Sequence, residues 1–209
     1  MFTKLLKELK EYDFNKNNDA ELTFLGFQEI FFNPILLKKR INEVRQYFKT
    51  ININLNTNGD FLTKNSLMNL NVNVINVMDY DCKGVQYWTN KLLNLSCTNL
   101  IVQNNDIKAK FNNIWIRVTC NWPKHAGLEN RGGYFSKDNL TNLKWKNDMC
   151  LRVVPCPEPV YNINISYNGS VTPCCHIRFD DVKHEQYILG NLSNSSLYDI
   201  IFGEKMINF

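Results

Sequence analysis

Cysteines are the residues of this chain whose type and spacing could do chemistry. The 209 residues include seven of them, and four lie in the last third: Cys150, Cys156, Cys174 and Cys175. Lys4, Glu8 and Lys10 interrupt the apolar residues of the N-terminus, which is typical of an amphipathic helix rather than of a signal peptide. We therefore expect a cytoplasmic protein with reduced thiols, whose clustered cysteines are candidate metal or redox ligands.

A β-hairpin is predicted between Cys156 and Cys174. Residues 161–167 alternate between polar and apolar, Asn168-Gly169 is a strong turn signal, and residues 171–174 return as a second strand. Because a hairpin brings its flanks together, we expect the two thiols to face one metal ion or cluster.

Other C-terminal residues are candidates for the same site. Cys150 precedes Cys156 by six residues and could reach it. Cys175 points away from Cys174 if the strand continues, which favours only one of this pair as a ligand. Thiolates suit an iron–sulfur cluster or structural zinc, usually with four ligands. His176 could join a zinc site, although we expect it to be a surface histidine. The alternative for each cysteine is that it is a small buried apolar residue without a ligand role.

The first two thirds of the chain alternate between helical and strand patterns. Apolar residues recur at helical spacing in some segments and alternate with polar ones in others. The predicted order is helix 1–12, strand 21–25, helix 34–48, strand 51–56, turn 57–60, helix 61–70, strand 72–77, helix 85–96, and strands 99–103 and 114–120. This order predicts parallel β/α units, in an open sheet or part of a barrel.

Composition and charge exclude several classes of protein. Hydrophobic residues make up 44% and charged residues 21%, as in ordinary globular proteins. No apolar run approaches the roughly 18 residues of a membrane span. The formal net charge of +4 is too small to indicate nucleic-acid binding. We expect neither a membrane nor a nucleic acid as a partner.

Several short motifs follow one another along the chain. They are Leu25–Pro34 (LGFQEIFFNP), Thr57-Asn58-Gly59, Cys156 with Cys174-Cys175, Leu189-Gly190-Asn191 and Ser196–Ile200. In order and spacing they resemble the radical S-adenosylmethionine (AdoMet) family with a C-terminal SPASM/twitch extension. The family counterparts are Gly-x-Gly-Glu-Pro, Thr-Asn-Gly, Cys followed by Asp-Gly-x-Val-x-Pro-Cys-Cys, Leu-Gly-Asn and Ser-Leu-x-Glu-Ile. The resemblance covers nearly the whole chain.

The resemblance implies an α/β fold class. It is a partial (β/α) barrel of parallel strands, TIM-like and of the radical SAM type with the first strand missing, followed by a small α+β SPASM/twitch-like unit with a β-hairpin. We place the barrel at 1–122, a loop or linker at 123–149 and the C-terminal unit at 150–209. In this family a [4Fe–4S] cluster reduces AdoMet to methionine and a 5′-deoxyadenosyl radical, which abstracts a hydrogen atom.

The resemblance also implies cofactor-binding residues. The AdoMet site would include Gly26, Glu29, Thr57, Asn58 and Gly59, with Glu29 engaging the amino group of AdoMet. The extension implies a further [4Fe–4S] cluster on Cys156 and the Cys174-Cys175 pair, and Cys150 or Cys120 could substitute for the ligands of the final Cys-x2-Cys.

Three departures from the family pattern bear on function. The 209 residues contain no Cys-x3-Cys-x2-Cys, the motif that holds the catalytic cluster, and no final Cys-x2-Cys. Gln28 and Ile30 replace Gly and Pro in the AdoMet motif. We therefore interpret the chain as a diverged or truncated homologue that does not generate the radical alone. It would act as a binding or partner subunit, for instance for a peptide, since many SPASM proteins modify peptides.

Two alternatives remain open. The chain could be an iron–sulfur radical SAM enzyme whose cluster loop comes from another chain or from upstream sequence. It could instead be a structural zinc module on Cys150, Cys156, Cys174 and His176.

Overall fold

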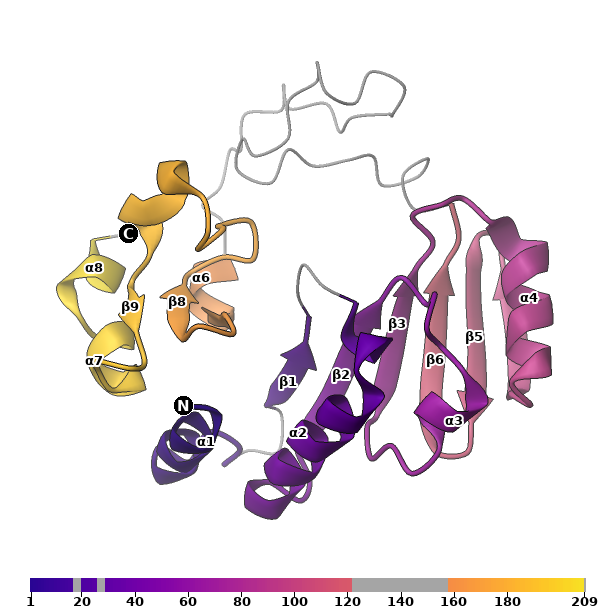
Figure 1. The fold of residues 1–209 in the computed structure, drawn as a ribbon, viewed down its shortest axis with the longest axis horizontal. Helices are drawn as coiled ribbons and strands as arrows, with labels where there is room; N and C mark the ends of the chain where they lie inside the picture. The colour runs from indigo at the N-terminus through magenta and orange to yellow at the C-terminus, as the bar shows by residue number, and fades with distance from the viewer. Residues whose placement is uncertain (17–19, 26–28, 122–157, 209) are drawn as a thin grey trace. The chain divides into compact units, whose positions relative to one another are not determined.

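The computed structural model describes residues 1–16, 20–25, 29–121 and 158–208, which form two compact units (Figure 1). Lys10–Gly127 make up one, here called the sheet unit. Met1–Leu9 and Leu128–Phe209 make up the other, the C-terminal unit. The linker predicted at 123–149 lies outside the described residues, and the domain boundaries drawn from the sequence stay a prediction. No helix of the described part is long and apolar enough to cross a membrane.

The sheet unit contains a six-stranded sheet with the order β1-β2-β3-β6-β5-β4. The strands are β1 (Glu21–Phe24), β2 (Asn52–Thr57), β3 (Val74–Met78), β4 (Thr98–Gln103), β5 (Asp106–Phe111) and β6 (Ile114–Thr119). The pairs β1-β2, β2-β3 and β3-β6 are parallel, whereas β4-β5 and β5-β6 are antiparallel. The predicted α/β class with parallel strands is confirmed, and β5 is a strand that the sequence prediction missed.

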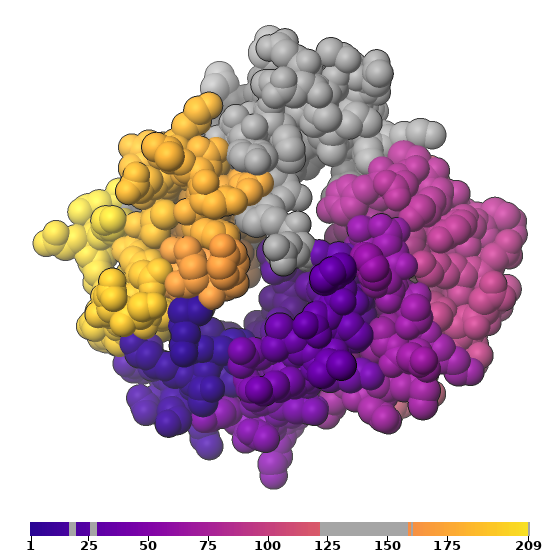
Figure 2. All heavy atoms as spheres, in the orientation of Figure 1, coloured from indigo at the N-terminus to yellow at the C-terminus, as the bar shows by residue number. Residues whose placement is uncertain are grey.

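Helices cover one face of this sheet. They are η1 (Ile30–Phe32), α2 (Pro34–Tyr47), α3 (Lys64–Leu67) and α4 (Gly84–Asn94). In Figure 2 the violet atoms of α2 lie on the side of the sheet unit that is turned toward the viewer. Apolar strand residues such as Ile53, Ile75 and Ile116 are fully buried, while the residues that follow them, Asn54, Asn76 and Arg117, are polar. Because strand side chains alternate between faces, the sheet has an apolar face under the helices and a polar face opposite.

The C-terminal unit is built on a small antiparallel sheet. Its strands β7 (Asn164–Ile165), β8 (Ser170–Thr172) and β9 (Gly190–Asn191) lie in the order β7-β8-β9. The hairpin predicted at Asn168-Gly169 joins β7 to β8, and Gly169 has a φ of +86°. Four short helices complete the described part of the unit, namely α6 (Glu158–Tyr161), η3 (Val182–Tyr187), α7 (Leu197–Ile201) and α8 (Glu204–Ile207).

Helix α1 (Phe2–Glu11) contributes side chains to the C-terminal unit. Leu5 is buried in one apolar cluster with Val171, Leu189, Leu192, Leu197 and Ile200. Lys4 Nζ donates to the carbonyl of Leu192 at 2.8 Å, and Glu8 Oε2 accepts the N–H of Leu197 at 2.6 Å. That N–H is one of the groups that the first turn of α7 leaves unpaired. The start of the chain and its end therefore share one core.

Replacing Leu5 by Ala should destabilise the C-terminal unit, because it removes buried apolar volume from this cluster. We expect a loss of about 2 to 4 kcal/mol in the free energy of local opening. The measurement is hydrogen exchange of the Leu189 N–H, which is bonded to Val171 O at 2.9 Å. Lys7→Ala on the exposed side of α1 is the control. Equal exchange rates in the two variants would contradict the shared core.

Candidate functional site

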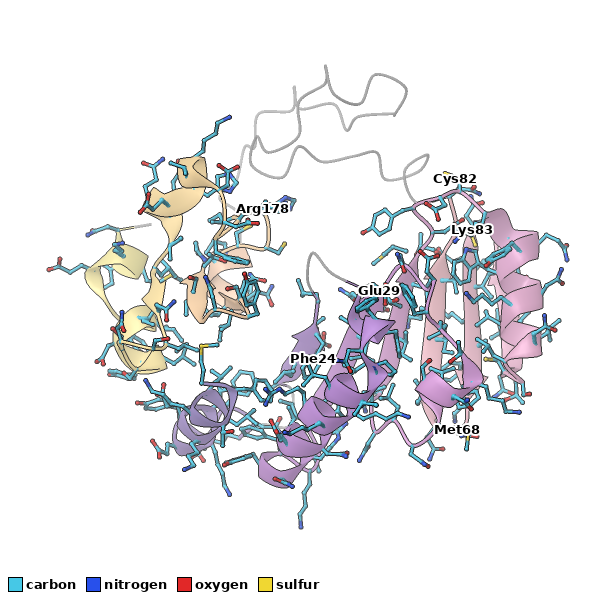
Figure 3. The ribbon with its side chains drawn as sticks, in the orientation of Figure 1. Phe24, Glu29, Met68, Cys82, Lys83 and Arg178 are labelled. Carbon is cyan, nitrogen blue, oxygen red and sulfur yellow. The ribbon has the colours of Figure 1, made fainter. Side chains whose placement is uncertain are left out.

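The carboxyl ends of the parallel strands bring four of the predicted cofactor residues to one edge of the sheet. Thr57 ends β2, Asn58 and Gly59 follow it, and Glu29 lies between β1 and η1. Glu29 is labelled in Figure 3. Gly26, the fifth predicted residue, lies outside the described residues. Ligands of open α/β sheets bind beyond the carboxyl ends of the strands, so this edge is the candidate cofactor site.

The carboxylate of Glu29 connects three backbone segments at this edge. Its Oε1 accepts from Phe31 N at 3.0 Å and from Thr57 Oγ1 at 2.5 Å, while its Oε2 accepts from Asn58 N at 2.9 Å. Two carboxylate oxygens offer about four acceptor positions. Within the described part of the chain, three are taken, and the fourth lies on Oε2. That position suits an ammonium donor, because charge-assisted hydrogen bonds to carboxylates are strong.

The turn after β2 is shaped by Gly59. Its φ is +78°, and a Cβ at this position would lie 2.5 Å from Cη2 of Trp88. The hydroxyl of Thr57 accepts the Gly59 N–H at 2.9 Å, and Lys91 Nζ donates to the Gly59 carbonyl at 2.7 Å. Glycine is required here both for its left-handed backbone and for the close approach of Trp88. Helix α4, which carries Trp88 and Lys91, thus supports the turn that holds Asn58 against Glu29.

Two lysines set the charge beside this turn. Lys83 Nζ lies 2.7 Å from Asp60 Oδ1 and 3.1 Å from Asp81 Oδ2. The hydrogen bond to Asp60 raises the pKa of Lys83, which stays protonated. Burial lowers the pKa of Lys91, and the nearby charge of Lys83 adds to this effect.

Asp79 is a structural residue of the edge that sequence reasoning missed. It follows β3, is 1% exposed, and accepts the N–H groups of Lys83, Gly84 and Asn121, each at 2.9 Å. Burial acts to raise the pKa of Asp79, but these backbone donors outweigh it and hold the pKa below the usual value. An Asp between a strand and a Lys-Gly helix start is the sequence signal that could have found it.

The C-terminal unit brings together a second group of candidate ligands. One ligand atom from each of Cys174, Cys175 and His176 lies within 4.8 Å of the others. The expectation that the two thiols point apart required a strand through Cys175, whereas β8 ends at Thr172. A turn follows instead and places both thiols beside His176, which is half-buried rather than at the surface position that the sequence predicts. Cys150 and Cys156, the other predicted ligands, lie outside the described residues.

The donor set of this group fits a soft metal centre. Thiolate and imidazole are the ligands of zinc in structural sites, and thiolates hold iron–sulfur clusters. His176 N also donates to Cys174 Sγ at 3.4 Å, which ties the turn to one of the two thiols. The described residues supply three of the four ligands that such centres usually have. Cys97 and Cys120, by contrast, are buried in the sheet unit, and burial raises the pKa of each thiol to about 11.

Asp79→Asn should destabilise the sheet unit, because the neutral amide offers fewer acceptor positions to three backbone N–H groups. At neutral pH we expect a loss of about 1.5 to 3 kcal/mol in unfolding free energy. The lowered pKa means that ionised Asp79 stabilises the fold above its ordinary pKa of about 3.9, and that this stabilisation is lost as pH falls through the folded value. The unmodified protein should therefore lose stability more steeply below pH ~4 than the variant does.

The measurement for Asp79 is urea unfolding followed by tryptophan fluorescence at several pH values. Asp81→Asn, a side chain that is 65% exposed, is the control and should behave like the unmodified protein. Parallel pH profiles for Asp79→Asn and the unmodified protein would contradict the role assigned to this carboxylate.

Comparisons with known proteins agree with both units. Residues 156–209 match the family model of SPASM, an iron-sulfur cluster-binding domain. Among solved structures, the chain is similar to the radical SAM enzyme BtrN in complex with AdoMet and 2-DOIA, with 19% identity and a TM-score of 0.62 over 100% of this chain and 71% of that chain. Selenomethionine BtrN in an open conformation gives 17% identity and a TM-score of 0.56 over 100% and 69% of the two chains.

No curated protein matches the sequence significantly. The identity to BtrN is low, so this likeness shows the fold and not the activity. The predicted resemblance is nevertheless confirmed: residues 156–209 match the SPASM family model, and the chain has a fold similar to that of BtrN.

Proposed function

We propose that this protein is a diverged radical SAM/SPASM homologue that binds AdoMet at the Glu29 edge and acts as a binding or partner subunit. The observation that carries the proposal is the arrangement of Glu29, Thr57 and Asn58, in which one acceptor position of Glu29 Oε2 has no donor among the described residues. BtrN, whose fold is similar, was solved in complex with AdoMet, which supports the same class of cofactor for this chain.

A role other than independent radical generation is favoured by the cysteine spacings. A [4Fe–4S] cluster bound by Cys-x3-Cys-x2-Cys would supply the electron that cleaves AdoMet, and these 209 residues contain no such motif. The residues of this chain would hold and orient AdoMet through Glu29 and the Asn58 turn. A peptide or protein substrate, or a partner enzyme subunit, is the class of partner that we propose, on the strength of the SPASM match.

Calorimetry with AdoMet tests the cofactor site. Glu29→Gln replaces one carboxylate oxygen by an NH2 group and removes the negative charge that would face the amino group of AdoMet. We expect the dissociation constant to rise by about tenfold or more, equivalent to at least about 1.4 kcal/mol. Glu204→Gln, on the exposed face of α8, is the matched control and should leave binding unchanged.

Two outcomes of the calorimetry would overturn this site. One is that the unmodified protein gives no heat of binding with AdoMet. The other is an unchanged dissociation constant for Glu29→Gln, provided that the variant keeps the amide spectrum of the folded protein.

The C-terminal thiols are proposed to hold the SPASM iron–sulfur cluster. When bound, this group would supply electron transfer or structural support. Cys174 and Cys175 would ligate it, with Cys150 and Cys156 as the other predicted ligands. A structural zinc ion is the second candidate, and the imidazole of His176 beside the two thiols is the donor set that supports it. Tetrahedral zinc ligands at about 2.3 Å lie about 3.8 Å apart, which is compatible with three ligand atoms that lie within 4.8 Å of one another.

Iron, acid-labile sulfide and zinc should be measured after anaerobic purification and reconstitution. We expect about four irons per chain with matching sulfide, and a loss of most of this metal in Cys174→Ala. Cys97→Ala, which removes a buried thiol of the sheet unit, should retain the full metal content. About one zinc without sulfide would identify the zinc module instead. A protein without either metal would contradict both centres.

A further inference from the structure

The polar face of the six-stranded sheet carries two cations in directly opposite positions. Lys108 on β5 and Arg117 on β6 are register partners in an antiparallel pair. Their neighbours Ile107 and Ile116 are fully buried on the helix-covered face. Because side chains alternate along a strand, Lys108 and Arg117 both project from the other face, and both are exposed.

This pairing of like charges is unfavourable as it stands. Side chains directly opposite in an antiparallel pair start from Cβ atoms about 4.5–5.5 Å apart, and like charges there are destabilising. In the described part of the chain, the side chains of Lys108 and Arg117 form no ion pair and no hydrogen bond. Asp106, the nearest acid on the same face of β5, forms no ion pair with either of them among the described residues. A bound anion would relieve the repulsion.

Amide side chains continue the row across the sheet. Asn76 on β3 is the register partner of Arg117, and Asn56 on β2 is the partner of Asn76. Asn76 Nδ2 donates to Asn56 Oδ1 at 3.0 Å. Two register pairs further along the strands and on the same face, Lys110 Nζ lies 5.6 Å from the centre of the Trp115 ring. The face thus combines cations, amide donors and an aromatic ring.

A cavity of about 220 Å³ lies over this part of the sheet. The side chains of its lining that come from the polar face are Asn76, Met78, Asp106, Lys108, Arg117 and Thr119. On the neighbouring strand β2, Asn54 Oδ1 is buried without a hydrogen-bond partner among the described residues. The polar face therefore has room for a small molecule.

We propose that Lys108 and Arg117 form a binding site for an oxyanion, the carboxylate or phosphate group of a small ligand. The guanidinium of Arg117 presents a planar fork that matches two oxygens of such a group, and Lys108 adds a compact positive charge. Asn76 lies next to them as a donor to a further oxygen. This inference adds to the proposed function a class of ligand, namely a small anion. The binding of the anion stands by itself, whereas its role as a ligand of a radical SAM/SPASM homologue rests on the proposed function.

Amide chemical shifts of the nitrogen-15-labelled protein test the site directly. Inorganic phosphate and succinate are titrated separately at constant ionic strength, with signals of residues 106–108 and 117–119 as the readout. We expect saturable shifts, and a dissociation constant about tenfold higher in Arg117→Gln because the bidentate partner is lost. Lys108→Gln should weaken binding as well. Lys39→Gln, an exposed residue of α2 with the same change in charge, should not.

Thermal unfolding provides a second readout. Without anion, Arg117→Gln should unfold at a higher temperature than the unmodified protein, because the repulsion is gone. Phosphate or succinate should then raise the unfolding temperature of the unmodified protein and of Lys39→Gln more than that of Arg117→Gln. Equal increases in all three proteins would reflect general salt effects and would overturn the proposal.

The experiment also distinguishes a phosphate ligand from a carboxylate ligand, and the anion site from the proposed AdoMet site. Saturation by phosphate alone supports a phosphate ester, and saturation by succinate alone supports a carboxylic acid. Shifts that saturate with neither probe overturn the site. Glu29→Gln should keep anion binding, so a failure of AdoMet binding and a failure of anion binding are separate results.

Discussion

The carboxylate of Glu29 is the interaction on which the arrangement of the candidate site depends. Its two oxygens receive hydrogen bonds from Phe31, Thr57 and Asn58, of which the last two lie 28 and 29 residues further along the chain. A buried or half-buried carboxylate needs such donors, because an unpaired charge there would be costly. The same bonds fix the turn at which a ligand of the sheet would bind. The Glu29 carboxylate therefore both holds the loops together and forms part of the candidate binding site.

Helix α4 and Asp79 extend this arrangement to the middle of the sheet. Asp79 collects the first N–H groups of α4 and the N–H of Asn121, so that the ends of β3, β6 and α4 are held together. Trp88 and Lys91 of α4 then contact Gly59. A chain of contacts thus runs from a buried aspartate to the turn that faces Glu29. These contacts explain how the short, polar turn at Asn58-Gly59 is held in one conformation without an apolar core of its own.

The two units divide the candidate chemistry between them. The sheet unit holds the Glu29 edge and the polar face with Lys108 and Arg117, while the C-terminal unit holds the thiols and His176. Helix α1 belongs by its buried Leu5 and Glu8 to the C-terminal unit, although it precedes the sheet in sequence. The family resemblance places this helix in the barrel at 1–122, a boundary that stays a prediction, because an amphipathic pattern shows that one side is buried but not what it is buried against.

Apart from the grouping of Glu29 with the Thr57 turn, which only the family resemblance implied, the amino-acid sequence by itself determined the α/β class, the alternating strands and the hairpin at Asn168-Gly169. These features rest on local periodicity, turn chemistry and motif order, which are properties of short segments. Only the tertiary structure decided the role of Asp79, the meeting of Cys174, Cys175 and His176, and the pairing of Lys108 with Arg117. Each depends on where a strand ends or which strands are neighbours, and these are set by long-range packing rather than by the residues next in sequence.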